Sequence, residues 1–359
     1  MVVSRVVRCM KRNKKKLLLL AVATAGAYVG GRYLMRRVSQ ISDRQTVAQR
    51  QVWRLKEHFE SNRKTCNSTV ISLLPTLKDA LHAQLNAEAI TAELRTRPSN
   101  KLSLWENLKT ISFARVVVGV VSCSMLVAYM RVQLSILGAT MFRDLHRPPG
   151  EEPGAPPDVQ KKFLSYVQYF LQDGVVGVAS CTRKATEEVL ADLSLKHQMT
   201  SQDMVQLVTQ VGTRMAANAP GGGGGGGSLG SCIRQYLTPR EPLLQLEGEE
   251  EGEGSGDSSC VAYMLSATRD VLDCNDFATV LDGLINQGFA ELHKGLCDVY
   301  HSAAQASSTL PLAKIIPLIT DHYQVLFSPT FIQGLQGNKG LQRLSENIYE
   351  AFSEGSTQQ

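Results

Sequence analysis

Apolar residues recur at helical spacing from residue 38 onward, at intervals of three, four and seven positions. This spacing predicts an amphipathic helix, and nothing in residues 38–74 interrupts it. One long helix is therefore expected, which Pro75 would kink or end, since proline removes a backbone donor and clashes with the preceding turn. A second apolar stripe begins at Leu77 and repeats at Leu81 and Leu85, and Asn86 then allows a small break.

The next helical stretch ends at a corner made by Pro98, which disfavours helix in the residue before it. Ser99 or Asn100 can cap a new helix, and Ser103 with Glu106 forms a second possible capping box. In the new helix, one apolar face and a neighbouring face can be told apart by spacing. The first holds Leu104, Leu108 and Ile111, and the second holds Lys101 and Trp105.

Residues 116–130 form an uncharged, apolar run between Arg115 and Arg131. Its fifteen residues are short for a membrane span, which needs about 20. Because the run lies in the middle of the chain, among helices that need a partner to pack against, it is predicted to be a central core helix.

The remaining helices are predicted from caps and apolar periodicity. After a loop rich in Pro, Gly and Glu, a helix is expected to start with Asp158 as its cap and to end at Asp173 and Gly174. Further helices are expected at 175–197, 202–217 and 261–273, from Asp276 onward, and at 310–317, and the last helix closes with residues 347–352. The fold class is all-α.

The N-terminus carries a different signal. A basic segment, 1–16, precedes an uncharged run, 17–31, and Arg32, Arg36 and Arg37 follow. With the apolar residues after Arg32, residues 17–35 are predicted to be one transmembrane anchor. The alternative is a cleavable secretory signal, but the arginines after the run hinder translocation and argue against it. The charges on the two sides are too balanced to decide the orientation, although they slightly favour a cytosolic N-terminus.

A Gly- and Glu-rich stretch at 219–259 is predicted to be a disordered linker, with a possible short element at 243–246. Its seven consecutive glycines are not followed by Gly-Lys-Ser/Thr, so a phosphate-binding loop is not supported.

The composition of the chain narrows the classes of function that it could have. The net charge of +5 is mild and is concentrated at the N-terminus, which fits an anchor flank better than a nucleic-acid surface. The eight cysteines include no CxxC pair, so reduced thiols are expected and no metal site is predicted. No catalytic motif is present, and neither a cofactor nor a small-molecule substrate is predicted.

Several stretches resemble the peroxin-3 family: RPSNKLSLWENLK at 97–109 with ISFAR directly after it, PPDVQ at 156–160, and LPLAKIIP at 310–317. The resemblance covers most of the chain apart from the Gly/Glu linker. It implies an elongated, twisted helical bundle, residues 36–359, on a single-pass anchor in the peroxisomal membrane, with the large domain facing the cytosol. It also implies a docking receptor, not an enzyme, for the cytosolic chaperone peroxisomal biogenesis factor 19, which delivers newly made membrane proteins.

The resemblance further implies that an amphipathic helix of this chaperone lies in a groove at the corner around Pro98. Trp105 would be the buried aromatic anchor, and the basic residues would steer acidic groups of the partner. The residues implied in partner binding are Thr91, Leu94, Arg95, Lys101, Trp105, Leu108 and Lys314. At position 95 the family usually has Lys, so the charge is kept while its geometry changes.

Two alternatives of other classes stay open. The chain could be a membrane-anchored helical enzyme with an active site that no motif reveals, because catalytic groups meet in space rather than in sequence. It could also be a secreted helical protein whose first segment is removed. The residues alone also leave open whether Trp105 is a core residue, since most Trp side chains are largely buried.

Overall fold

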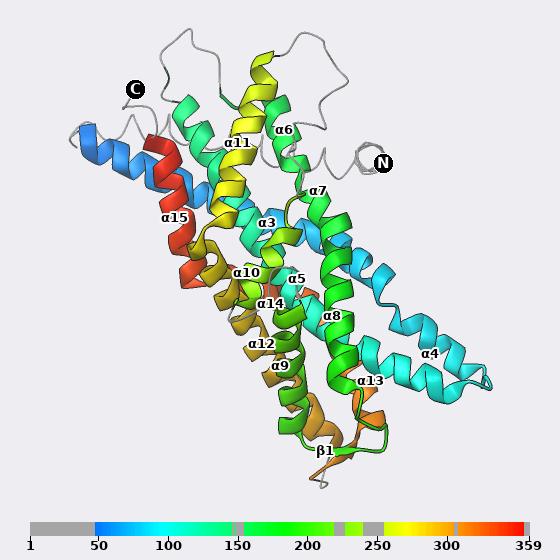
Figure 1. Cartoon of the computed structure of the whole chain (residues 1–359). Coiled ribbons are helices and arrows are strands. Elements are labelled where there is room, and N and C mark those ends of the chain that lie inside the picture. Colours follow the sequence, from blue (N-terminus) through cyan, green and yellow to red (C-terminus); the bar gives the residue numbers. More distant parts are fainter. Residues whose placement is uncertain are drawn as a thin grey trace.

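A single helix, α5 (Lys101–Asp144), runs through the middle of the molecule and is surrounded by the other helices (Figure 1). The computed structural model describes residues 47–145, 147, 154–218, 227–239, 255–304 and 308–354. Within these ranges the elements are helices apart from two short strands, which confirms the all-α prediction. The predicted anchor at 17–35 lies outside the described residues.

The helices that precede or surround α5 differ widely in length. The long ones are α3 (Val47–Gln84), α8 (Val175–Leu190), α9 (Ser201–Asn218), α11 (Ser255–Asp273), α12 (Asn275–Ala304) and α15 (Lys339–Glu354). The shorter ones are α4 (Ala87–Arg95), α6 (Pro157–Ser165), α7 (Val167–Tyr169), α10 (Leu229–Ile233), α13 (Leu312–His322) and α14 (Pro329–Gln336). A π-helical turn, Phe170–Gly174, joins α7 to α8, and 3₁₀ turns follow α10 (Arg234–Tyr236) and α13 (Tyr323–Phe327).

Helix α5 is the core of the bundle. Every residue from Leu108 to Met141 is buried, so this part of the helix is covered on all sides. Of the described helices, α5 alone is long and apolar enough to cross a membrane, and its apolar stretch lies wholly inside the protein. The prediction that residues 116–130 form a core helix is therefore confirmed.

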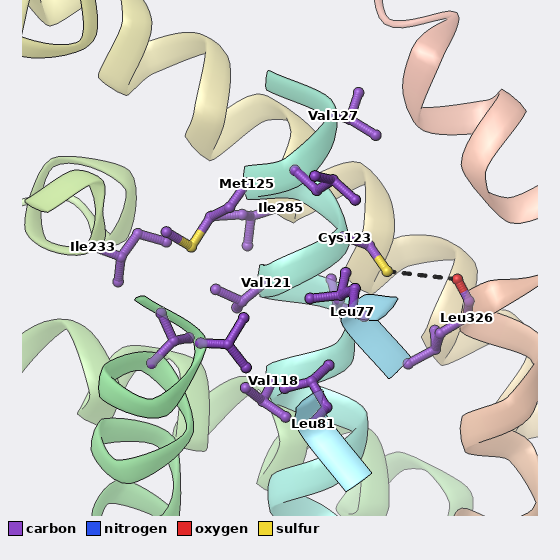
Figure 2. Close-up of a cluster of buried hydrophobic side chains, with 14 of the residues drawn as sticks. Leu77, Leu81, Val118, Val121, Cys123, Met125, Val127, Ile233, Ile285 and Leu326 are labelled. Atoms are coloured by element: carbon purple, nitrogen blue, oxygen red, sulfur yellow. Dashed lines mark hydrogen bonds between the residues drawn. The ribbon is translucent and has the colours of Figure 1, made fainter. Parts of the chain in front are cut away.

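Side chains from distant parts of the sequence meet around α5 (Figure 2). Leu77 and Leu81 of α3 approach it from one side, as the predicted stripe on that helix requires. Ile233 of α10 and Ile285 of α12 pack near Met125 from another. Since each of these side chains is almost fully buried, the neighbouring helices are held to α5 mainly by removal of apolar surface from water.

Of the two outcomes predicted for Pro75, a kink or an end of the first long helix, the end is wrong, because α3 continues through it to Gln84. Pro75 lies on the exposed face of α3, so water can satisfy the carbonyl that loses its intrahelical partner. On the opposite face, Leu74 and Leu77 are buried and hold the helix against the core on both sides of the proline. The predicted break at Asn86 is confirmed: its side chain accepts a 2.8 Å hydrogen bond from the Ala89 N–H and caps α4.

Two predicted boundaries in the next segment are wrong. Pro156, not Asp158, is the N-cap of α6, and Asp158 lies in the first turn, where its charge favours the helix N-terminus. The chain also does not leave helical geometry at Gly174, because the π-helical turn leads straight into α8. Gly174 is required there for another reason: a Cβ would lie 2.2 Å from the Tyr236 carbonyl oxygen.

The expectation of disorder throughout residues 219–259 is wrong for residues 227–239. Helix α10 forms there, begins at a Ser228 cap and packs into the bundle, with Cys232, Ile233 and Leu237 buried. Its first turn is tied to α12, because the Gly230 N–H donates a 2.7 Å hydrogen bond to the Asp282 carboxylate. Residues 255–259 are also helical, as the start of α11. Residues 219–226 and 240–254, which include the possible element at 243–246, lie outside the described part.

Helix α8 ends at Leu190, earlier than the predicted end at residue 197. The chain then forms a strand, β1 (Gln198–Met199), which pairs antiparallel with β2 (Leu310–Pro311). The residues between α8 and α9 therefore reach the start of α13, far along the sequence. This pairing was not predicted, because a two-residue strand leaves no periodic pattern.

Candidate partner-binding site

Helices α4 and α5 meet at a sharp corner that projects from one end of the molecule (Figure 1). The Thr96 N–H and hydroxyl both donate to backbone carbonyls of the last turn of α4 and end that helix. Arg97 then adopts a left-handed backbone conformation, with φ of 55°, just before Pro98. Arg97 and Pro98 together turn the chain, and α5 begins after Asn100.

Trp105 lies at the edge of the core, a position that the sequence pattern alone left open. The stripe made by Leu104, Leu108 and Ile111 is buried, whereas Trp105 is half-buried and packs against the core from one side. Part of the indole is therefore still accessible. A large aromatic side chain that is only partly covered can gain further burial when a partner binds.

Helix α13 runs alongside the first half of α5. Ser112 of α5 and Thr320 of α13 share a 2.8 Å hydrogen bond. One turn further on, the Arg115 guanidinium lies 4.2 Å from the centre of the Tyr323 ring. Tyr323 begins the 3₁₀ turn that follows α13. Because the contacts advance in the same direction along both segments, α13 runs parallel to α5 in this region.

This register sets the level of Lys314 relative to Trp105 along the two helices. Trp105 precedes Ser112 by about two helical turns, so both lie on the face of α5 that meets α13. Lys314 precedes Thr320 by a similar length, about 9 Å at 1.5 Å per residue. The first turn of α13 therefore lies level with the first turns of α5, and Lys314 is exposed there.

Arg95, Arg97 and Lys101 are exposed cations at this corner, and Lys314 is exposed on the first turn of α13. None of them takes part in the ion pairs found among the described residues. The nearby acids are Glu93, which is exposed, and Glu106, whose carboxylate is 43% exposed but pairs with Lys109. The corner therefore presents excess positive charge beside a partly exposed indole, which suits an acidic, amphipathic partner.

The corner is held to the core by a buried cation. The Arg115 guanidinium, 2% exposed, donates 2.9 Å hydrogen bonds to both carboxylate oxygens of Glu88 in α4. Partial burial raises the pKa of Glu88, but hydrogen bonds from its own backbone N–H and from Arg115 outweigh it and hold that pKa below its usual range. Glu88 is therefore ionised at neutral pH and joins α4 to α5.

The seven residues implied in binding differ in what they expose. Arg95, Lys101 and Lys314 are exposed, and Thr91, Leu94 and Trp105 are half-buried. Leu108 is 4% exposed, so it supports the surface from below instead of forming it. The Thr91 hydroxyl donates to the Ala87 carbonyl within α4.

Sequence reasoning missed one apolar side chain. Leu102, at the tip of the corner, is 71% exposed. Its spacing was the available signal, because it falls off the stripe of Leu104, Leu108 and Ile111 on a helix whose other face is buried. It extends the apolar part of the candidate surface beyond Trp105.

A metal-binding site is not assembled in the described part of the chain. No three His, Cys, Asp or Glu side chains there come together in a way that would hold a metal ion. The cysteine thiols in the same ranges are free, as expected for reduced cysteines. Burial raises the pKa of the Cys66 and Cys123 thiols, which keeps them protonated and unreactive.

Comparisons with known proteins agree with the resemblance seen in the motifs. The family model described as Peroxin-3 matches residues 8–102 and 148–351. Proteins named peroxisomal biogenesis factor 3 from Cricetulus longicaudatus, Mus musculus and Bos taurus are each 36% identical to this chain over 360 residues. Each alignment covers 96% of this chain and 96% of the relative. The chain therefore belongs to the peroxin-3 family.

Proposed function

We propose that this chain acts in peroxisome biogenesis as a membrane-anchored docking receptor for peroxisomal biogenesis factor 19, the chaperone that delivers newly made peroxisomal membrane proteins. Family membership supports the role in peroxisome biogenesis and membrane assembly. The observation that supports the docking role is the partly exposed indole of Trp105, beside cations that take part in no ion pair within the described ranges.

The mechanism is equilibrium binding of an amphipathic helix. The apolar face of the chaperone helix covers Trp105, Leu94 and Leu102, and its acidic residues approach Lys101 and Lys314. Charge attraction raises the rate of encounter, whereas burial of the indole provides most of the affinity. No bond is made or broken in the partner, so the chain needs neither a cofactor nor a metal ion for this role.

The proposed topology follows from the same role. Residues 17–35 anchor the chain in the peroxisomal membrane, and the helical domain faces the cytosol, where the loaded chaperone arrives.

The test is binding of purified peroxisomal biogenesis factor 19 to the full chain in detergent micelles. Trp105→Ala is expected to weaken binding by about 30- to 1000-fold, the loss that corresponds to roughly 2–4 kcal/mol at a hot spot. Trp53→Ala is the matched control, because Trp53 is the other tryptophan, is 43% exposed and lies on α3, away from the corner. Its affinity is expected to stay within twofold of the wild-type chain.

Two outcomes would count against the proposal. If the wild-type chain does not bind the chaperone, the receptor role is wrong. If it binds and both tryptophan variants keep the affinity of the wild-type chain, docking takes place on another surface. Far-UV circular dichroism of each variant shows whether a loss of binding accompanies loss of helix.

A further inference from the structure

Lys109 is a buried lysine whose ammonium group is held by the C-terminal end of α8 and by a carboxylate of α5. Its side chain is 4% exposed, and its ammonium group donates to the backbone carbonyls of Leu190 at 3.1 Å and Leu193 at 2.8 Å. It also pairs with the Glu106 carboxylate at 2.5 Å, one turn earlier on α5. The carbonyls at the C-terminal end of a helix lack intrahelical partners, so Lys109 supplies the donors that the end of α8 needs.

The segment held by Lys109 in turn holds the start of α13. The Ala313 N–H donates to the Leu195 carbonyl at 3.0 Å, and the Leu312 N–H donates to the His197 carbonyl at 2.9 Å. These are first-turn donors of α13, and its N-cap residue, Pro311, provides no side-chain acceptor for them. Residues 195–197 therefore cap α13 with their backbone, and Lys314 follows directly.

We propose that Lys109 is a positioning residue for partner binding, an inference that rests on the proposed function. It keeps Lys314 level with Trp105 although it is itself too deeply buried to touch the partner. Lys109 lies one turn after Trp105 on α5 and fixes residues 190–193. The chain passes directly from those residues to 195–197, whose carbonyls cap α13. The ammonium group therefore links the indole and Lys314, which lie more than 200 positions apart in the sequence.

An aliphatic side chain at position 109 would break this link. It would leave the Leu190 and Leu193 carbonyls without the ammonium donor, and most of the residues between them and β1 are exposed. The segment would loosen, and the first turn of α13 would lose fixed acceptors for two N–H groups. Lys314 would then sample many positions, and the partner would have to order it on binding.

The test is a double-mutant cycle on the full chain in micelles, with purified peroxisomal biogenesis factor 19 as the probe. Lys109→Met is expected to weaken binding about tenfold in the wild-type background. In a Lys314→Ala background the same change is expected to cost less than twofold, because no cation is left to position. Lys109→Arg, which keeps a multidentate donor, is expected to recover part of the affinity.

A matched control separates positioning from general damage. Arg131 is another buried cation of α5, and it donates to the Asn67 side-chain oxygen at 2.8 Å. It lies about 33 Å further along the helix from Lys109. Arg131→Met also removes a buried charge, but it is expected to leave the affinity of the folded chain within twofold.

Hydrogen exchange in the absence of partner gives an independent readout. Lys109→Met is expected to speed exchange at the amides of Leu312 and Ala313, not only near Leu190. A purely local role at the end of α8 would leave the α13 amides unchanged, and the inference would then be wrong. Equal losses for Lys109→Met with and without Lys314, or for Arg131→Met, would also overturn it. If Trp105→Ala leaves binding intact, it is instead the proposed function that fails.

Discussion

The two ends of one helix show how this protein separates stability from binding. From Leu108 to Met141, α5 is covered on every side, and its charged residues have polar partners inside the protein. In its first turns only one face is covered, and Lys101, Leu102 and part of Trp105 remain accessible. The covered part stabilises the fold, and the uncovered part keeps apolar surface and charge that a partner can still bury.

The largest change in stability is expected for substitutions in the covered part of α5. Phe113→Ala, at a fully buried position, should lower the free energy of unfolding by about 3–5 kcal/mol through lost transfer energy and a cavity. Leu102→Ala, at the exposed tip, should change it by less than about 0.5 kcal/mol. Chemical denaturation of the full chain in micelles measures both, and similar losses for the two variants would contradict the comparison.

Breaking the ion pair that connects the two regions should lower the free energy of unfolding by an intermediate amount. Glu88→Gln leaves the buried Arg115 guanidinium without a carboxylate, but Glu88 is half exposed and water can partly replace it. The expected cost is about 1 kcal/mol, measured by the same denaturation experiment. Glu187→Gln, which removes an exposed i,i+4 pair with Arg183 on α8, is the control and should cost less than about 0.5 kcal/mol.

The same carboxylate gives a dependence on pH. Because the pKa of Glu88 is lower in the folded chain than in the unfolded one, its contribution is fully present above about pH 5. It is lost as the pH falls through the lowered folded-state pKa. The difference in stability between wild type and Glu88→Gln should therefore shrink in acid, as measured by denaturation at several pH values. A difference that stays constant down to pH 3 would show that ionisation of Glu88 is not the cause.

The smallest effect is expected for a single exposed charge in the uncovered region. Arg95→Gln should slow association with peroxisomal biogenesis factor 19 about two- to threefold at low salt and leave the dissociation rate nearly unchanged. At high salt the difference should disappear, because exposed charges are screened. Stopped-flow kinetics at two salt concentrations measures it, and an effect confined to dissociation would mean that Arg95 makes a direct contact.

Some boundaries could be predicted from local chemistry and others could not. Asparagine is a favoured N-cap residue, and its side chain needs only the N–H groups of the next turn. The break before α4 at Asn86 was therefore visible in the sequence. Pro75 was misjudged because its effect depends on which face of α3 is solvated. Gly174 was misread as a helix end, although it is needed for a close approach of Tyr236 from a distant segment.

The glycine-rich region was misjudged for a related reason. Its composition is that of a flexible linker, and composition averages over residues that behave differently. Ile233 and Leu237 are buried in the bundle, and this requires a hydrophobic surface that helices far away in the sequence provide. Local composition does not contain that information.

By itself the sequence determined the helical class, the central place of residues 116–130 and the corner at Pro98, because periodicity, apolar runs and proline act locally. Only the tertiary structure decided that Leu108 is hidden, that Leu102 is exposed, and that Lys109 connects α8 and α13 near Trp105. The exposure of a side chain depends on which distant helix packs beside it, and the sequence pattern of one helix cannot specify the position of its neighbours.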